Sequence, residues 1–421
     1  MTDDYHALLA RREAMRLRDQ LLTPATRAGR ASAPAPRGTY EGAADQELIT
    51  RNLAQVTPFD ELIGHLYEAM FERHPYLRQL FPDSMEFQRA HLERAFWYLI
   101  ENLHRPDDLA AYCARLGRDH RKLGVLPVHY DVFEEALVEA LRRSADGRLG
   151  ADVEAAWVRM LRFVAAAMVD GAKGALAEPS YWGGTVTEHQ RRRPDLAVLR
   201  VRPSQPYPYR PGQYATLQTP LLPHTWRPYT PAGLPGPDGE LEFHVRRTGP
   251  DGVSDALVTR TGVGDTLRLG PARGTVTLDD DLARDVLIVA GGTGWATARA
   301  LIEDLAARRR PGRTAHLFLG ARTAEDLYDV PVLSRLEKRC PWLRVVPVIG
   351  DGPGASEHGS VVEEMTRHGD LTDRTAYVSG PPGMVAAAVW RLTGLGLPAE
   401  RIRHDPATAT GRTAVPLGLT P

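Results

Sequence analysis

The sequence predicts a multidomain chain in which an all-α block, a β domain and an α/β domain follow one another. Its 421 residues exceed what a single hydrophobic core usually holds. Apolar residues recur at helical spacing from about 45 to 178. Proline then becomes frequent, with eleven in 194–239 against six in 45–180, and a later glycine-rich turn separates a buried strand from a helix. We assign an arm at 1–44, a helical block at 45–180, a β domain at 181–283 and an α/β domain with a short tail at 284–421.

The composition is typical of a soluble globular protein whose partners are small molecules. Hydrophobic residues make up 43% and charged residues 25%, and the formal charge is −1, which gives no electrostatic footprint for nucleic acid or an anionic membrane. Cys113 and Cys340 are too few for a disulfide framework or an iron–sulfur cluster, so a metal would rest mainly on histidine. Apolar runs such as 164–169 are far shorter than a membrane span, and the N-terminus is charged, so we expect a cytoplasmic protein. The oligomeric state stays open.

The first 44 residues differ in amino-acid composition from the rest of the chain. Residues 3–22 predict a short helix, and 23–44 are rich in Ala, Pro, Gly and Ser, a composition that does not pack. We therefore treat 1–44 as a flexible peripheral arm.

One histidine of the helical block is a candidate haem ligand. His120 lies on a helix that ends before Gly124 and Pro127, and Tyr130 follows ten residues later. A haem iron needs an axial imidazole whose other ring nitrogen is held by a hydrogen bond. Taken alone, His120 is equally well explained as one of 14 histidines, lying on a solvated helix end.

The helical block resembles the globin domain of the flavohaemoglobin family. The similarity rests on the string Leu116–His120, on the Phe81-Pro82 break after an aromatic-rich helix, and on the setting of Tyr67. It implies that His120 is the proximal ligand, and so the metal-binding residue, and that Tyr130 supports it.

The same resemblance assigns the distal side of a ligand pocket. Tyr67 and Gln88 match the family's distal tyrosine and glutamine, Leu92 the leucine that shapes the pocket, and Phe81 the phenylalanine that packs on the haem. A hydroxyl and an amide can both donate a hydrogen bond to bound dioxygen. The alternative for Tyr67, Phe81 and Leu92 is ordinary core packing. His91 is a rival for Gln88, because the connection after Phe81 is shorter here than in the family.

The chain departs from the family on the proximal side. The family carries a glutamate on its last globin helix, and that position falls near Gly174 here. Asp170 and Glu178 are the acids that could take its place. The electron push onto bound oxygen depends on which residue, if any, does so.

The β domain contains the string Trp226–Pro231, which resembles the Arg-x-Tyr-Ser/Thr signature of ferredoxin-reductase-like flavin domains. The resemblance implies an antiparallel β-barrel that binds FAD. Arg227 would face the pyrophosphate, Tyr229 the isoalloxazine or ribityl, and Thr230 the flavin N5. Arg227 and Tyr229 share one face of an extended strand.

Two further strings of the β domain fit the same flavin site. Gln213 and Tyr214, in Tyr209–Tyr214, match a strand next to the cofactor, although alone the string is only a turn and a strand. Gly252, Val253 and Ser254 precede a predicted helix whose free N–H groups suit a phosphate. The alternative for Ser254 is a simple helix cap.

The α/β domain predicts a dinucleotide site. The buried strand Val286–Ala290 leads into Gly291, Gly292, Thr293 and Gly294, where glycines let the backbone approach a pyrophosphate and the helix start supplies N–H donors. A second string, Tyr377–Met384, resembles the Cys-Gly-Pro-x-x-Met strand end that borders the nicotinamide in these reductases, which assigns Gly380 and Pro381 to the cofactor. The resemblance implies a doubly wound parallel sheet that binds NAD(P).

Three positions of the reductase part depart from the family, and a fourth, Arg322, bears on the choice between NADH and NADPH. Ser379 replaces the usual cysteine, and Trp295, which follows the glycines, would crowd or stack on the cofactor. Arg322 would either contact an adenosine 2′-phosphate or lie over the adenine, and we favour NADH. Ala407 stands where relatives carry an aromatic residue over the flavin, which predicts a flavin more open to oxygen.

The resemblance covers about 45–405. It implies electron transfer from NADH or NADPH through FAD to haem b iron, and oxidation of nitric oxide with O₂ to nitrate, the nitric oxide dioxygenase reaction. The partners would be O₂, nitric oxide and NAD(P)H, without nucleic acid or membrane. Three alternatives stay open: a haem and flavin reductase that acts on peroxide or another acceptor, a globin-coupled O₂ or nitric oxide sensor, and a flavin reductase whose helical block binds no haem.

Overall fold

A computed structural model of the chain describes residues 40–405, apart from 237, 309–311, 351–356 and 368–370. The helix predicted over 3–22 and the tail with Ala407 lie outside the described residues. The first described helix begins at Gly42, slightly before the predicted start of the helical block.

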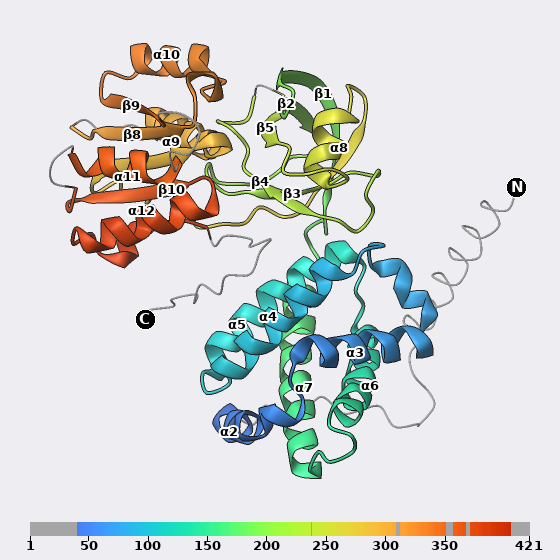
Figure 1. The fold of residues 1–421 in the computed structure, drawn as a ribbon. Helices are drawn as coiled ribbons and strands as arrows, with labels where there is room; N and C mark the ends of the chain where they lie inside the picture. The colour runs from blue at the N-terminus through green and yellow to red at the C-terminus, as the bar shows by residue number, and fades with distance from the viewer. Residues whose placement is uncertain (1–39, 237, 309–311, 351–356, 368–370, 406–421) are drawn as a thin grey trace, which may run out of the picture. The chain divides into compact units, whose positions relative to one another are not determined.

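The all-α block consists of six helices within the described residues. They are α2 (Gly42–Asn52), α3 (Phe59–Arg73), α4 (Glu86–Asn102), α5 (Pro106–His120), α6 (Pro127–Ser144) and α7 (Ala151–Gly174) (Figure 1). Proline occupies the first position of both α5 and α6, where its missing N–H costs nothing. The spacing of apolar residues places Leu62, Leu66 and Trp157 in a fully buried core. The predicted all-α globin fold is confirmed.

Helices α5 and α7 approach each other closely at Gly117. A Cβ atom at this position would lie 1.9 Å from the carbonyl oxygen of Met168. Glycine is therefore required on the helix that ends at His120, because any side chain would separate the two helices.

The β domain is a six-stranded antiparallel sheet in the order β4-β3-β6-β1-β2-β5. Its elements are β1 (Trp182–Arg193), β2 (Leu196–Pro203), β3 (Ala215–Gln218), β4 (Arg227–Tyr229), β5 (Leu241–Arg246), α8 (Val253–Thr259) and β6 (Thr266–Leu269). A single bridge between Pro231, just after β4, and Phe243 of β5 connects the two edges. The sheet is therefore nearly closed, as the predicted barrel requires.

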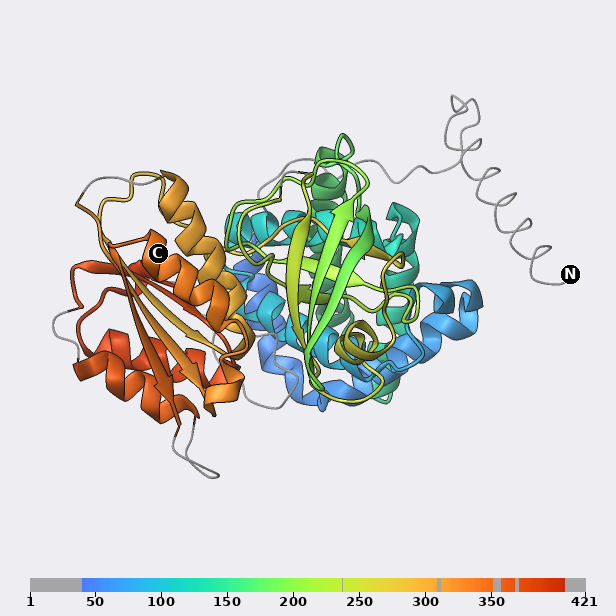
Figure 2. The same ribbon diagram turned by 90° about the horizontal axis from the view of Figure 1, so that it is seen from above.

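The α/β domain has a parallel sheet in the order β11-β10-β7-β8-β9. Its elements are β7 (Asp285–Gly291), α9 (Trp295–Arg308), β8 (Ala315–Ala321), α10 (Val330–Arg339), β9 (Leu343–Ile349), α11 (Glu357–Arg367), β10 (Arg374–Ser379), α12 (Pro382–Gly394) and β11 (Ile402–Arg403). Val286 and Ile288 pack with α9 and α10, and Leu287 and Val289 with α11 and α12. Helices thus cover both faces, as Figure 2 shows, and the doubly wound fold is confirmed.

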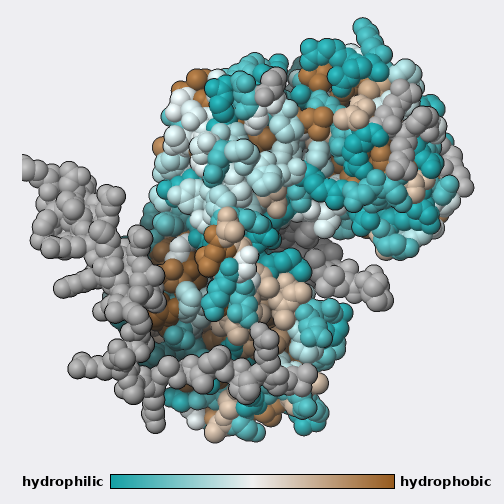
Figure 3. Space-filling view, turned by 180° about the vertical axis from the view of Figure 1, so that it is seen from behind, coloured by the Kyte–Doolittle hydropathy of each residue, from teal (hydrophilic) through white to brown (hydrophobic). Residues whose placement is uncertain are grey.

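Hydrophilic residues cover most of the face seen in Figure 3, with hydrophobic residues in smaller groups. None of the helices in the described ranges is both long and apolar enough to cross a lipid bilayer.

Candidate functional site

His120 ends helix α5 and is followed by a turn in which Gly124 adopts a φ of +78°. Its Nδ1 lies 2.9 Å from the carbonyl oxygen of Leu116, one turn earlier, to which it donates. This bond fixes the ring and leaves Nε2 facing away from the helix backbone as a potential ligand atom. Burial lowers the pKa of His120, although the bond to Leu116 and the charge of Asp119 act in the opposite direction.

The predicted distal residues lie on α3 and α4. Tyr67 is buried, and its ring lies edge-on to Phe81 with centroids 5.6 Å apart. Burial raises the pKa of the Tyr67 hydroxyl, so the residue stays a neutral donor. The Oε1 atom of Gln88 is buried and has no hydrogen-bond partner among the described residues. Leu92 is half-buried.

Gln88 and its rival His91 have different surroundings. His91 is exposed, and its Nδ1 lies 2.9 Å from the carbonyl oxygen of Phe87 on its own helix. A buried amide oxygen without a partner costs free energy unless something else satisfies the amide. The structure therefore favours Gln88 over His91 for a pocket role.

Among the described residues, no carboxylate forms a hydrogen bond with the His120 ring, whose bond goes to Leu116. Gly174 is exposed at the end of α7, and Asp170 is exposed as well. Glu178 forms an ion pair with Arg118. Tyr130 is half-buried. Burial, and to a smaller extent the nearby Cys113, raises its pKa to about 12. The His120 ring thus has a backbone carbonyl, that of Leu116, as its hydrogen-bond acceptor.

The predicted flavin residues lie together at the edge of the barrel. β4 carries Arg227 and Tyr229, and Thr230 follows directly. The Arg227 guanidinium lies 4.3 Å from the centre of the Phe87 ring and donates to the carbonyl of Trp226. No carboxylate among the described residues pairs with Arg227. An arginine without a counter-ion fits the pyrophosphate of FAD.

The other predicted flavin neighbours have structural partners of their own. Gln213 Oε1 accepts a hydrogen bond from the Arg210 backbone, and Tyr214 exchanges two backbone hydrogen bonds with Arg273. All three residues Gly252, Val253 and Ser254 were expected to precede the helix, but α8 begins at Val253 and only Gly252 precedes it. Ser254 is buried within the first turn, and its hydroxyl accepts from the Thr248 backbone. Ser254 is therefore not a cap of α8.

The glycine-rich turn lies against the end of β10. A Cβ at Gly294 would lie 2.2 Å from the carbonyl oxygen of Ser379. Gly292 has a φ of +53°, and Gly292, Thr293 and Gly294 form a single 3-10 turn before α9. The Ser379 hydroxyl donates to Thr297 Oγ1 at 3.1 Å, so it keeps a polar contact where relatives have cysteine. Gly380 and Pro381 follow at the same edge of the sheet.

Trp295 takes a position that the sequence did not predict. Its side chain is buried in the core between the sheet and α9, and its Nε1 donates to Asp329 at 2.8 Å. The indole lines a small pocket together with Tyr328 and Leu333. Trp295 thus packs beneath the dinucleotide edge, held by a buried carboxylate.

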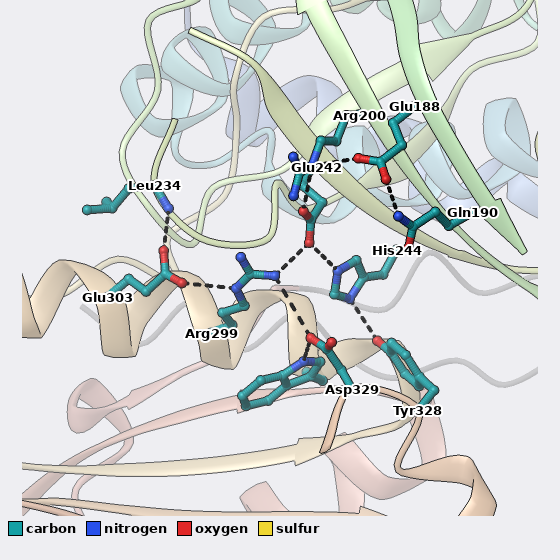
Figure 4. A network of polar contacts seen from close by, with 11 residues as sticks. Glu188, Gln190, Arg200, Leu234, Glu242, His244, Arg299, Glu303, Tyr328 and Asp329 are labelled. Carbon is teal, nitrogen blue, oxygen red and sulfur yellow. Dashed lines mark hydrogen bonds and ion pairs between the residues drawn. The ribbon is translucent and has the colours of Figure 1, made fainter. Parts of the chain in front are cut away.

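A polar network that sequence reasoning missed connects the β domain and the α/β domain (Figure 4). Glu242 of β5 accepts from Arg299 of α9 at 2.6 Å and from His244 Nε2 at 3.0 Å. The Tyr328 hydroxyl donates to His244 Nδ1 at 2.9 Å. Burial raises the pKa of Glu242, but His244 and Arg299 outweigh it and lower this pKa to about 2. No local pattern signals the network, because β5 supplies Glu242 and His244 whereas Arg299 and Tyr328 come from distant parts of the chain.

Arg299 continues the network toward the flavin barrel. Its Nε donates to Glu303 at 3.0 Å, and Glu303 accepts from the Leu234 backbone at 3.0 Å. Arg299 also lies 3.9 Å from Asp329, the partner of Trp295. One guanidinium therefore joins the barrel, helix α9 and the tryptophan behind the glycine turn.

The segment around His120 also contacts the barrel. Lys122 is buried, lies 3.7 Å from Asp119, and donates to Thr216 of β3 at 2.8 Å. Arg273 donates to Asp119 at 2.7 Å. Burial lowers the pKa of Lys122, and Asp119 counteracts this.

The residues present fit three cofactors. For a haem, His120 offers a ligand nitrogen and Gln88 a buried, unsatisfied amide. For FAD, Arg227 offers a cation that no described carboxylate neutralises. For a dinucleotide, the chain offers a glycine turn at the end of the parallel sheet, where Gly294 has no room for a side chain.

Comparisons with known proteins agree with this division. The globin family model matches 64–168, the oxidoreductase FAD-binding domain 184–277 and the oxidoreductase NAD-binding domain 288–389. With these domains the cofactors are haem, FAD and NAD(P)H.

Similar proteins include reductases and one flavohaemoglobin. The ferredoxin–NAD(P)⁺ reductase component of the naphthalene 1,2-dioxygenase and salicylate 5-hydroxylase systems of a Ralstonia species is 33% identical over 225 residues, 53% of this chain and 67% of that protein. The electron transfer component of the Pseudomonas putida xylene/toluene monooxygenase is 30% identical over 245 residues, 56% of this chain and 68% of that protein. The crystal structure of the flavohaemoglobin of Malassezia yamatoensis, with bound FAD and haem, has the same fold, with a TM-score of 0.68 and 17% identity over 86% of this chain and 98% of that one. The chain therefore belongs to the FAD- and NAD-binding oxidoreductases that include these reductase components, and its globin domain gives it the architecture of the flavohaemoglobins.

Proposed function

We propose that the protein is a nitric oxide dioxygenase, which uses electrons from NAD(P)H to oxidise nitric oxide with O₂ to nitrate. One NAD(P)H supplies two electrons, so two molecules each of nitric oxide and O₂ give two nitrates, NAD(P)⁺ and one proton. FAD and haem supply the redox chemistry when bound, since FAD splits a hydride into single electrons and haem activates O₂.

The observation that carries the proposal is that one globin fold holds a histidine fixed by its own helix, a buried tyrosine and a buried amide oxygen without a described partner. His120 is held through Nδ1, and Gln88 Oε1 is buried without a partner. The buried Tyr67 supplies a neutral hydroxyl on the neighbouring helix α3. The Tyr67 hydroxyl can donate a hydrogen bond, and so can the amide N–H group of Gln88, and such donors would stabilise the negative charge that dioxygen acquires as it is reduced.

The proximal geometry favours this reaction over the reduction of peroxide. A carboxylate partner raises the basicity of a ligating histidine, whereas a backbone carbonyl is a weaker acceptor. His120 donates to the carbonyl of Leu116, and Glu178 is engaged by Arg118. A weaker electron push disfavours O–O bond cleavage and leaves dioxygen available to nitric oxide.

The barrel and the α/β domain position the electron donors. Gly294 lets the glycine turn pack against the end of β10, where the dinucleotide would bind, and Ser379 with Thr297 would form a polar edge for the nicotinamide. Arg227 and Tyr229 lie on the strand that would hold the flavin. Lys122 and Thr216 connect that barrel to the segment of His120.

The test is a spectroscopic titration of the purified, haem-loaded protein. Without oxygen, NADPH or NADH should shift the Soret band to that of ferrous haem, and a pulse of O₂ and nitric oxide should then yield nitrate in step with the O₂ consumed. Tyr67→Phe should lower nitrate yield per O₂. His91→Gln, on the exposed face of α4, serves as the matched control and should leave it unchanged.

Three outcomes would contradict the proposal. A flavin spectrum without a Soret band would leave a flavin reductase with a helical scaffold. Rapid NAD(P)H oxidation by peroxide with little nitrate would make it a peroxide reductase. A haem that binds O₂ or nitric oxide but is not reduced by NAD(P)H would favour a sensor.

A further inference from the structure

The globin block and the barrel contact each other on both sides of His120. Asp119, directly before the histidine, accepts a hydrogen bond from Arg273 Nε at 2.7 Å. Lys122, two residues after the histidine, donates to the hydroxyl oxygen of Thr216 on β3 at 2.8 Å. The proposed haem ligand is therefore bracketed by two contacts with the barrel.

The Lys122 ammonium occupies a socket on the barrel, which we define by Thr216, Trp226 and Gly270. Only 9% of the Lys122 side chain is exposed. Besides its bond to Thr216, its Nζ lies 5.1 Å from the centre of the Trp226 ring, within the range of a cation–π contact. A Cβ at Gly270 would lie 3.2 Å from Nζ and would overlap the Thr216 hydroxyl. The socket therefore needs glycine at this position.

A lysine suits this socket better than an arginine does. Only three of the 52 basic residues are lysines, namely Lys122, Lys173 and Lys338, so arginine is the ordinary cation of this chain. An ammonium is a compact group with three rotatable donors, whereas a guanidinium is a planar fork that needs more room. The close approach of Nζ to Gly270 favours the compact group.

The socket belongs to the strands that would hold the flavin. Thr216 lies on β3, opposite Pro228 of β4. Trp226 directly precedes Arg227, the cation that fits the pyrophosphate of FAD. Gly270 follows β6 and donates through its backbone N–H to the carbonyl oxygen of Thr216 at 2.8 Å. A displacement of the lysine would therefore move the segment of the proposed haem ligand relative to β3 and β4.

We propose that Lys122 is a positioning residue for electron transfer from FAD to haem, because its insertion into the socket fixes the segment of His120 against the flavin-binding strands. The pair of Asp119 and Arg273 holds the other side of the histidine. Lys122 itself gains and loses neither an electron nor a proton. The rate of haem reduction then scales with the fraction of molecules in which the globin and the barrel are docked. The inference rests on the electron path of the proposed function.

The first experiment measures docking in the full-length holoprotein by hydrogen–deuterium exchange. Lys122→Ala removes a hydrogen bond and a cation–π contact, which should lower the docking equilibrium about tenfold, equivalent to about 1.4 kcal/mol. Protection should fall together in the peptides that cover 121–126 of the globin and 214–218 of the barrel. Lys173→Ala, at an exposed lysine near the end of α7, is the matched control and should change neither peptide.

The second experiment separates the two electron-transfer steps by anaerobic stopped-flow absorbance after mixing with NADH or NADPH. In Lys122→Ala the flavin band should bleach at the parent rate, while the Soret shift of haem reduction should slow by up to about tenfold. Gly270→Ala changes the socket from the barrel side and should slow haem reduction in the same way. Gly262→Ala, whose Cβ would meet nothing within 4 Å, is its control. Because Lys122→Ala and Gly270→Ala disrupt one contact, the loss in the double variant should be smaller than the product of the two single losses.

Haem reduction at the parent rate in Lys122→Ala would overturn the inference. So would equal slowing of flavin and haem reduction, which would indicate a general loss of structure, or a loss of protection in 121–126 alone, which would assign Lys122 to the globin fold. Nitric oxide takes no part in these measurements. A protein that reduces its haem but forms no nitrate therefore refutes the dioxygenase proposal and leaves this one standing.

Discussion

Replacing Glu242 with glutamine should destabilise the polar contacts between the barrel and the α/β domain in a pH-dependent way. The pKa of Glu242 is lowered to about 2 from an ordinary 4.5. Each pKa unit corresponds to about 1.4 kcal/mol, so the ionised carboxylate contributes about 3 kcal/mol to the free energy of unfolding at neutral pH. Its side chain is 14% exposed, so solvent screens the network little.

The sign of the pH dependence follows from the direction of this shift. Because the pKa is depressed in the folded state, the contribution is fully present above pH 4.5 and is lost as the pH falls toward 2. Glu242→Gln should therefore cost about 3 kcal/mol at pH 7 and progressively less below pH 4.5. Urea unfolding, followed by the fluorescence of released flavin at several pH values, measures both quantities.

A neighbouring acid provides the control. Glu240 pairs with Arg202 at 2.7 Å on the surface, where 51% of the arginine side chain is exposed. Such pairs contribute about 1 kcal/mol or less, so Glu240→Gln should have a small effect. The reasoning is refuted if Glu242→Gln is as stable as Glu240→Gln at pH 7, or if its deficit stays constant down to pH 3.

Three further substitutions test the fold around the sites. Gly294→Ala would place a Cβ 2.2 Å from a backbone oxygen, so it should abolish dinucleotide binding in calorimetry; unchanged binding would show that the turn tolerates a side chain. Trp295→Phe removes the donor to Asp329 and should cost about 1–3 kcal/mol in thermal unfolding, and a neutral result would mean that Arg299 alone satisfies the acid. Gly117→Ala should separate α5 from α7 and weaken haem retention, whereas Gly174→Ala, which meets open space, should not; equal haem loss from both would argue against the close helix crossing.

Local patterns were sufficient for the elements and for several site residues. The apolar run 286–290 with the glycines behind it predicted β7, its turn and α9, because a buried strand, a phosphate turn and a helix start are properties of neighbouring residues. His120 was predicted as a fixed ligand, and its anchor is the carbonyl of Leu116 on the same helix. The roles of the predicted site residues in binding and catalysis stay predictions.

Contacts between side chains far apart in the chain could not be predicted from local sequence patterns. Trp295 was expected to crowd the cofactor, but it is buried against Asp329. Ser254 was left open between a cap and a phosphate site; its hydroxyl bonds to Thr248, so it is not the cap, and the phosphate role stays a prediction. In both cases the deciding partner is a polar side chain or backbone group that the fold brings close. No periodic pattern in the sequence indicates which group that is.

The sequence by itself determined the order of domains, the class of each and the positions of the cofactor motifs, because periodicity, proline and glycine act through local conformation. Only the tertiary structure decided how the charges are paired. Glu242 meets Arg299 across two domains, and Asp326 gathers Arg193, Arg246 and Arg322 at the end of β8. Such pairs join side chains from distant segments of the chain, so no local pattern in the sequence reveals them.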